Sequence, residues 1–229
     1  MSHFTVAVFH KEDQSIEELL DPYEEVISID PRDSHSKKRA IQFARRHYDD
    51  CKNCTEITCM KKIVARNKPE KDGIIYLSNP EGKWDWWTIG GRWNKLLTIK
   101  SSEEKVDLAR VSDIDFSPNP NFYNDALVEW DAVVEGKTVD GLPPDPFVDK
   151  DELVKIYKTR DTYATVYACF HTYAVITPDG KWHAQGSMGW FGMDSASTEE
   201  ERDWRTHYKE RFIDTADPEW ILTIVDCHI

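Results

Sequence analysis

The segment Lys83–Trp93 constrains the fold of this chain more than any other stretch of its sequence. It contains four of the nine tryptophans, two adjacent glycines, one aspartate and one arginine within eleven residues. Tryptophan buries a large surface, and a glycine pair lets the backbone approach other groups closely. Arg92, between Gly91 and Trp93, would present a fixed cation beside aromatic faces. The segment therefore suits a ligand pocket or a recognition surface, without naming a reaction.

Composition limits the class of protein. The chain has 229 residues, 40% of them hydrophobic, which is typical of a globular protein with a proper core. Its formal net charge of −13 argues against an extended nucleic-acid-binding surface. The acidity fits either an ordinary solvated surface or a mimic of nucleic acid that occupies a partner's basic groove. No apolar run is long enough for a membrane helix, and the first residues do not resemble a signal peptide, so we expect a cytoplasmic protein.

The order of helix and strand patterns predicts an α+β fold. Apolar and β-branched residues at 4–9 and 220–225 indicate buried strands at the two ends of the chain. Residues 163–176 are aromatic and β-branched and are expected to form one long bent strand, whereas 123–135 fits either a strand or a helix. Trp204, Tyr208 and Phe212 form a helical stripe that is typical of a core. We expect one domain over residues 1–229, with a mostly antiparallel sheet and helices packed on one side.

A cluster of cysteines follows the second expected helix. His47, Cys51, Cys54 and Cys59 have the spacing H-x3-C-x2-C-x4-C. Zinc takes four nitrogen or sulfur ligands, and His47 shares a face with Cys51 if the helix continues that far. The cluster predicts a structural zinc site in a small knuckle inserted at about 45–62. Free thiols and a disulfide within the cluster are the alternatives.

Histidines near both ends of the chain are candidates for proton transfer. Strand alternation places Asp226 and His228 on one face and Cys227 on the other. His3 would join them if the first and last strands are neighbours. A carboxylate beside an imidazole orients it, so His3, Asp226 and His228 are catalytic candidates; a structural hydrogen-bonded cluster is the alternative.

A second glycine-spaced aromatic bend at residues 186–192 resembles the one at 84–93 in character. The two bends would form opposite walls of one pocket, or would simply pack two turns of a sheet together. In a pocket, Arg92 would bind an anion while tryptophans stack on a ring. Alternatively Arg92 pairs with Asp85. The predicted ligand-binding residues are Trp84, Asp85, Arg92, Trp93, Met188 and Trp190.

Four stretches of the chain together resemble a family of uncharacterised proteins from bacteriophage and prophage genomes. They are the start at residues 1–6, the centre at 83–86 and 89–93, the turn at 186–192 and the end at 225–229, and they cover about a third of the chain. The cysteine segment is outside this pattern. The resemblance implies a phage origin and a bacterial cytoplasm, and it carries no established activity.

Two functions of different classes are compatible with these features. The first is a phage accessory protein that engages a host protein or sequesters a small anionic ligand, for instance to blunt a defence system. The second is a small enzyme acting on a nucleotide or another phosphorylated substrate, with Arg92 on the anion and His3 or His228 moving protons. The sequence alone does not decide whether the chain is an enzyme.

Overall fold

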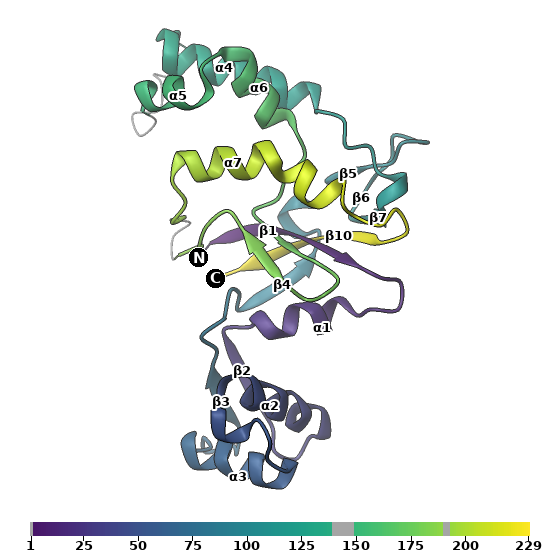
Figure 1. The fold of residues 1–229 in the computed structure, drawn as a ribbon, viewed down its shortest axis with the longest axis vertical. Helices are drawn as coiled ribbons and strands as arrows, with labels where there is room; N and C mark the ends of the chain where they lie inside the picture. The colour runs from purple at the N-terminus through teal and green to yellow at the C-terminus, as the bar shows by residue number, and fades with distance from the viewer. Residues whose placement is uncertain (1, 139–148, 190–192) are drawn as a thin grey trace. The chain divides into compact units, whose positions relative to one another are not determined.

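The computed structural model describes residues 2–138, 149–189 and 193–229. The strands at the two ends of the chain are neighbours in one sheet (Figure 1). Strand β1 (His3–His10) pairs antiparallel with β10 (Ile221–His228) over their whole length. The six-stranded sheet has the order β4-β10-β1-β8-β9, and β7 also pairs with β10. The β10–β7 and β8–β9 pairs are antiparallel, and β1–β8 is parallel. The predicted α+β class is confirmed.

The chain divides into two compact units. We call residues 1–16 and 87–229 the sheet unit, and residues 17–86 the cysteine unit. The knuckle expected at about 45–62 lies inside the cysteine unit, which extends well beyond it on both sides. The prediction of a single domain stays a prediction.

The sheet unit carries most of the elements. They are β1, β4 (Trp86–Ile89, which begins at the boundary), η3 (Gly91–Trp93), β5 (Leu97–Thr98), β6 (Lys105–Val106), β7 (Leu108–Arg110), η4 (Val111–Asp113), α4 (Pro120–Glu135), α5 (Lys150–Tyr157), α6 (Arg160–Ala168), β8 (Ala174–Ile176), β9 (Trp182–Ala184), α7 (Thr198–Tyr208), the π-helical turn η6 (Lys209–Ile213) and β10.

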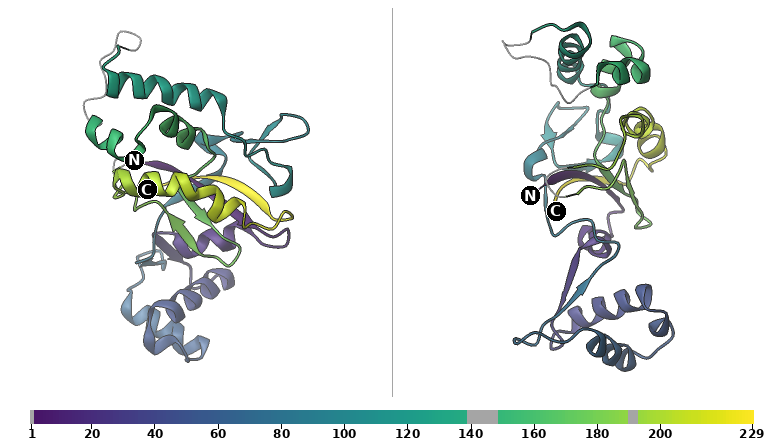
Figure 2. Two further views of the ribbon diagram at one scale, coloured as in Figure 1. Left: turned by 45° about the horizontal axis from the view of Figure 1, so that its top comes forward. Right: turned by 90° about the vertical axis from the view of Figure 1, so that its left-hand side faces the viewer.

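Helix α7 covers one face of the main sheet (Figures 1 and 2). Its stripe of Trp204, Tyr208 and, one turn further, Phe212 is buried against apolar residues of β1 and β10, as predicted. The indole N–H of Trp204 donates to the carbonyl oxygen of Thr172 (2.8 Å). Helices α5 and α6 contact α7, and with α4 they bury a second core around Trp130 and Tyr163. The sheet unit is therefore layered as sheet, α7 and α4–α6.

The prediction of one long strand at residues 163–176 is wrong. Residues 160–168 form α6, which begins at an N-cap where Thr159 accepts from the backbone N–H of Thr162, and only Ala174–Ile176 are a strand. Tyr163 and Val166 are buried against α4 and α5 in that second core. Aromatic and β-branched residues have weak intrinsic preferences, and here burial between helices overrides them. Residues 123–135, which fitted either type, lie in α4.

The cysteine unit is a strand pair covered by two helices. Its elements are α1 (Ile16–Leu20, which begins at the boundary), η1 (Asp21–Tyr23), β2 (Val26–Ile29), α2 (Ser34–His47), η2 (Asp49–Cys51), α3 (Glu56–Arg66) and β3 (Ile75–Ser78). Strands β2 and β3 are antiparallel. Their inward residues form a core with apolar residues of α2 and α3, and Cys51 and Cys59 are part of it.

A half-buried histidine before β8 is expected to make the stability of the sheet unit depend on pH. The ring N–H at Nδ1 of His171 donates to the carbonyl oxygen of Cys169 (2.9 Å). Burial, with the nearby charge of Arg205, lowers the pKa of His171 from 6.5 to about 4. Between these values the unfolded chain binds a proton that the folded chain does not, so stability falls as the pH falls through this window.

We expect the wild type to lose about 2 kcal/mol more than His171→Gln between about pH 7 and pH 5. Urea unfolding of both proteins at the two pH values measures this difference. Equal losses in the two proteins would show that His171 titrates normally in the folded state.

No helix in the described part of the chain has the length and apolar character needed to span a membrane.

Candidate functional site

Pairing of the chain ends brings the three catalytic candidates together. In the β1–β10 register His3 lies opposite His228, and Thr5 lies opposite Asp226. The ring N–H at Nδ1 of His3 donates to Oδ1 of Asp226 (2.9 Å). The rings of His3 and His228 meet edge to face, with centroids 5.0 Å apart. The first and last strands are therefore neighbours, and the convergence of His3, Asp226 and His228 that we expected in that case is confirmed.

The Trp-rich segment reaches the same carboxylate through its backbone. The N–H of Arg92 donates to Oδ2 of Asp226 (3.0 Å), so both oxygens of this buried side chain accept hydrogen bonds. Gly91 has φ +54°, and a Cβ there would lie 2.4 Å from the Asp226 side chain. The double glycine thus lets the turn approach Asp226, which ties the centre of the sequence to both ends.

This close approach gives a testable difference between two glycines. Gly91→Ala is expected to destabilise the protein by about 2 kcal/mol more than Gly136→Ala, because overpacking costs about 1–3 kcal/mol. Gly136 has a comparable φ of +69°, but a Cβ there meets nothing within 4 Å, so both variants share the left-handed backbone penalty. Thermal or urea unfolding of the pair measures the difference, and similar losses would contradict the close contact.

The geometry at His3 is that of an imidazole held by a carboxylate. A carboxylate on Nδ1 fixes the ring orientation and the tautomer in which Nε2 accepts a proton. Asp226 is 1% exposed, so this orientation is set from inside the sheet. Cys227 points to the opposite face, and burial raises its thiol pKa well above the ordinary value, so the pair Cys227–His228 is not arranged for nucleophilic attack.

Five of the six predicted ligand-binding residues lie in the described part of the chain, and they are distributed over both units. Arg92 is exposed on η3, while Trp93 packs against the sheet core and Met188 forms a bridge with Asp194. Trp84 is buried and Asp85 is exposed in the cysteine unit. Trp190 lies outside the described residues. The proposed common pocket for these side chains stays a prediction.

Three cysteines of the cysteine unit lie close together. Cys51 ends η2, Cys54 follows in the next turn, and Cys59 lies in the first half of α3. Their sulfur atoms are all within 4.8 Å of one another, and Cys51 and Cys59 are fully buried. Thr55 caps α3 by accepting from the backbone N–H of Thr58, which sets where the helix begins. The three thiols could hold a metal ion.

His47 is not in this cluster, which corrects the predicted four-ligand set. Helix α2 ends at His47, and Tyr48 is extended, so His47 and Cys51 do not share a helical face. The His47 ring instead lies against Phe43, with centroids 4.5 Å apart, and Nε2 is 3.8 Å from a Glu81 oxygen. Burial lowers the pKa of His47. The helix ends at about His47 as predicted, so the condition for His47 and Cys51 to share a face, a helix that continues through Cys51, is not met.

The surroundings of the thiols are buried and partly cationic. Burial, followed by the hydrogen bonds of the Cys59 thiol to the sulfurs of Cys51 and Cys54, raises the pKa of Cys59 to about 12. The Arg66 guanidinium lies 4.0 Å from the sulfur of Cys51 and 4.5 Å from the Tyr48 ring centroid. All five cysteines lie in the described part of the chain, and none of them is in a disulfide there.

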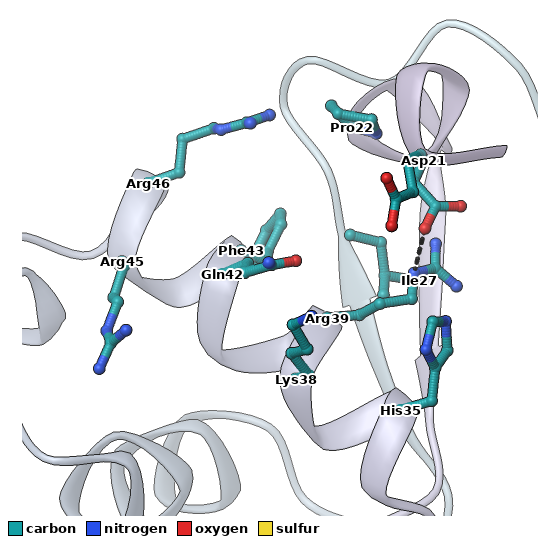
Figure 3. A pocket seen from close by; sticks show the side chains of 11 residues that line it. Asp21, Pro22, Ile27, His35, Lys38, Arg39, Gln42, Phe43, Arg45 and Arg46 are labelled. Carbon is teal, nitrogen blue, oxygen red and sulfur yellow. Dashed lines mark ion pairs between the residues drawn. The ribbon is translucent and has the colours of Figure 1, made fainter. Parts of the chain in front are cut away.

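A cavity of about 560 Å³ beside α2 is lined by several charged residues, among which Arg39 and Asp21 pair with each other (Figure 3). Arg39 contacts both Asp21 (3.0 Å) and Glu24. Burial raises the pKa of Asp21, although the charge of Arg39 opposes this shift. Arg45 and Arg46 extend from α2 in different directions (Figure 3). The most enclosed cation of this cavity is thus already neutralised.

The segment that forms α2 and α3 is positively charged, which the negative net charge of the whole chain did not indicate. Residues 34–66 contain nine Lys and Arg against three Asp and Glu, a net charge of +6, which leaves −19 for the rest of the chain. A local count over these two helices would have found this segregation. Between α2 and α3 lies a groove of about 880 Å³.

Comparison of the chain with known protein families, with curated proteins and with solved structures finds no match.

Proposed function

We propose that this protein is a binding protein, an accessory factor of a bacteriophage that engages a protein of its bacterial host. The observation that carries the proposal is the cationic groove between α2 and α3 on an otherwise acidic chain. Charge concentrated on one face steers association with a partner of opposite charge. The resemblance of the chain ends and centre to phage proteins supports three parts of this proposal. They are the phage origin, the location in the cytoplasm of the host cell and a role against host defence.

We further propose that Cys51, Cys54 and Cys59 hold a structural zinc ion. Thiolates are preferred zinc ligands, and the three sulfurs converge from one short segment. The ion would replace the thiol protons and fasten η2 to the first half of α3. Arg45 of α2 donates to the carbonyl oxygen of Cys54 (3.4 Å), so this fastening also acts on the groove.

The test of the binding function is native mass spectrometry of the tagged full chain, purified from the bacterial host. We expect the wild type to retain one host protein in stoichiometric amount, and Lys37→Glu/Lys61→Glu to lose it. The matched control Lys68→Glu/Lys71→Glu changes the charge equally on exposed residues that do not line the groove. Retention of no protein, or of the same protein by all three chains, would contradict the proposal.

An enzyme acting on a phosphorylated substrate is a second candidate, favoured by the His3–Asp226 geometry. Asp226→Asn discriminates this role from a structural one. Its amide N–H₂ would donate to Nδ1 of His3, which moves the ring proton to Nε2 and removes the base. Hydrolysis of nucleotides and phosphomonoesters by the wild type, reduced about 10³-fold or more in the folded Asp226→Asn protein, would support an enzyme. No turnover by the wild type would exclude this substrate class.

A further inference from the structure

The groove between α2 and α3 has cations on its rim that form no ion pair with a described carboxylate. Lys37, Lys38 and Lys61 have no ion pair with any described residue. Arg45, the fourth cation, donates only to a backbone carbonyl. Glu56 is the single acidic residue in the lining. Several other cations of the same unit are paired with carboxylates, as Arg39 is with Asp21 and Glu24. The rim therefore keeps a positive charge for an external partner.

The floor of the groove is aliphatic and partly open to solvent. It is formed by Ile41, Ile57, Met60 and Val64. Ile57 is 72% exposed and Val64 is 39% exposed, although large apolar side chains gain free energy from burial. Pockets for small ligands bury most of the ligand surface, which a floor this exposed does not do. The floor instead fits apolar side chains of a macromolecular partner.

The chemistry of the floor favours a protein over a nucleic acid. Sites for single-stranded nucleic acid stack bases on aromatic side chains, and the lining of this groove contains no aromatic residue. An exposed aliphatic floor gains most from contact with aliphatic side chains, which phosphate and sugar do not offer. A concave surface is also poorly matched to a flat membrane.

The secondary structure of the occupant follows from hydrogen bonding. The groove lies between two helices, whose backbone groups are already paired internally, so it offers no strand edge. A helix satisfies its own backbone and presents apolar residues at i, i+3, i+4 and i+7. Helix α3 has eleven residues, a length of about 16 Å, which matches two to three turns of a partner helix.

We infer that the α2–α3 groove binds an acidic amphipathic helix of a partner protein. Its apolar stripe packs on Ile57, Met60 and Val64, and its carboxylates pair with Lys37, Lys38 and Lys61. This inference rests on the proposed binding function and names the chemistry of the partner segment.

Fluorescence anisotropy with the full zinc-loaded chain tests it. The probe is a labelled helical peptide of about 16 residues, with Leu at i, i+3, i+4 and i+7 and Glu on the polar face. We expect binding that Lys37→Glu/Lys61→Glu weakens at least about tenfold and that Lys68→Glu/Lys71→Glu leaves within about twofold. Ile57→Ser, at an exposed position where little stability is lost, is expected to weaken binding about threefold to tenfold.

Other probes give the outcomes that would overturn the inference. They are the same peptide with Lys in place of Glu, a DNA single strand and duplex, and vesicles rich in phosphatidylserine. Binding of DNA or vesicles that the acidic peptide fails to displace, or no binding of the acidic peptide, would overturn it. A host protein retained through Lys37 and Lys61 would in that case leave the binding function standing. If the acidic peptide binds but no host protein is retained, the inference about the groove stands and the proposed binding of a host protein is contradicted.

Discussion

Cys59→Ser is expected to remove zinc from the purified protein and to unfold the cysteine unit under mild conditions. Zinc content should fall from about one ion per chain to almost none, because two thiolates and a buried hydroxyl make a poor site. Structural zinc contributes about 10–16 kcal/mol of apparent binding free energy in small zinc-binding peptides, so a loss of about 5 kcal/mol or more is reasonable here. Metal analysis and urea unfolding of the variant and the wild type measure both effects.

Cys169→Ser is the matched control for this prediction. Cys169 is a free, half-buried thiol outside the cluster, and its replacement should leave the zinc content unchanged. A strong chelator should reproduce the effect of Cys59→Ser in the wild type and should add nothing to it in the variant. Wild-type protein that is purified without near-stoichiometric zinc, and that does not take it up, would refute the metal site.

Asp226→Ala is expected to lower the free energy of unfolding of the sheet unit by about 3–4 kcal/mol. The substitution leaves two donors, the ring N–H of His3 and the backbone N–H of Arg92, without their acceptor in a largely buried place. Each such group costs about 1–3 kcal/mol. The loss should appear in urea unfolding monitored by tryptophan fluorescence, since Trp93 packs against the same core.

Asp226→Asn separates hydrogen bonding from the volume of the side chain. Its amide oxygen can accept from Arg92 while its N–H₂ donates to Nδ1 of His3, so we expect a loss of only about 1 kcal/mol. Equal destabilisation by Ala and Asn would show that the negative charge, and not the pair of hydrogen bonds, stabilises this junction.

The alternation or helical spacing of apolar residues was sufficient to predict several helices and strands. The apolar run at residues 4–9 became β1, and the stripe of Trp204, Tyr208 and Phe212 became the buried face of α7 and η6. The opposite orientation of Asp226 and Cys227 followed from the two-residue period of a strand. These predictions succeeded because each depends on the local periodicity of one element.

Predictions that depended on helix ends or on distant packing were less successful. Where α2 ends decided whether His47 could join the cysteines, and the helix ends at His47 itself. Residues 163–168 became helical because α4 and α5 bury Tyr163 and Val166. The cationic groove depends on how α2 packs against α3, since its rim takes Lys37 from one helix and Lys61 from the other.

The sequence by itself determined the α+β class, the buried end strands, the α7 stripe and the converging thiols, because these follow from periodicity and short spacing. Only the tertiary structure decided that β1 and β10 are neighbours, that Gly91 lies against Asp226, and that unpaired cations of two helices surround one apolar floor. Those contacts join residues as far apart in the chain as His3 and His228. No local pattern encodes which distant segments pair, because that choice depends on the packing of the whole core.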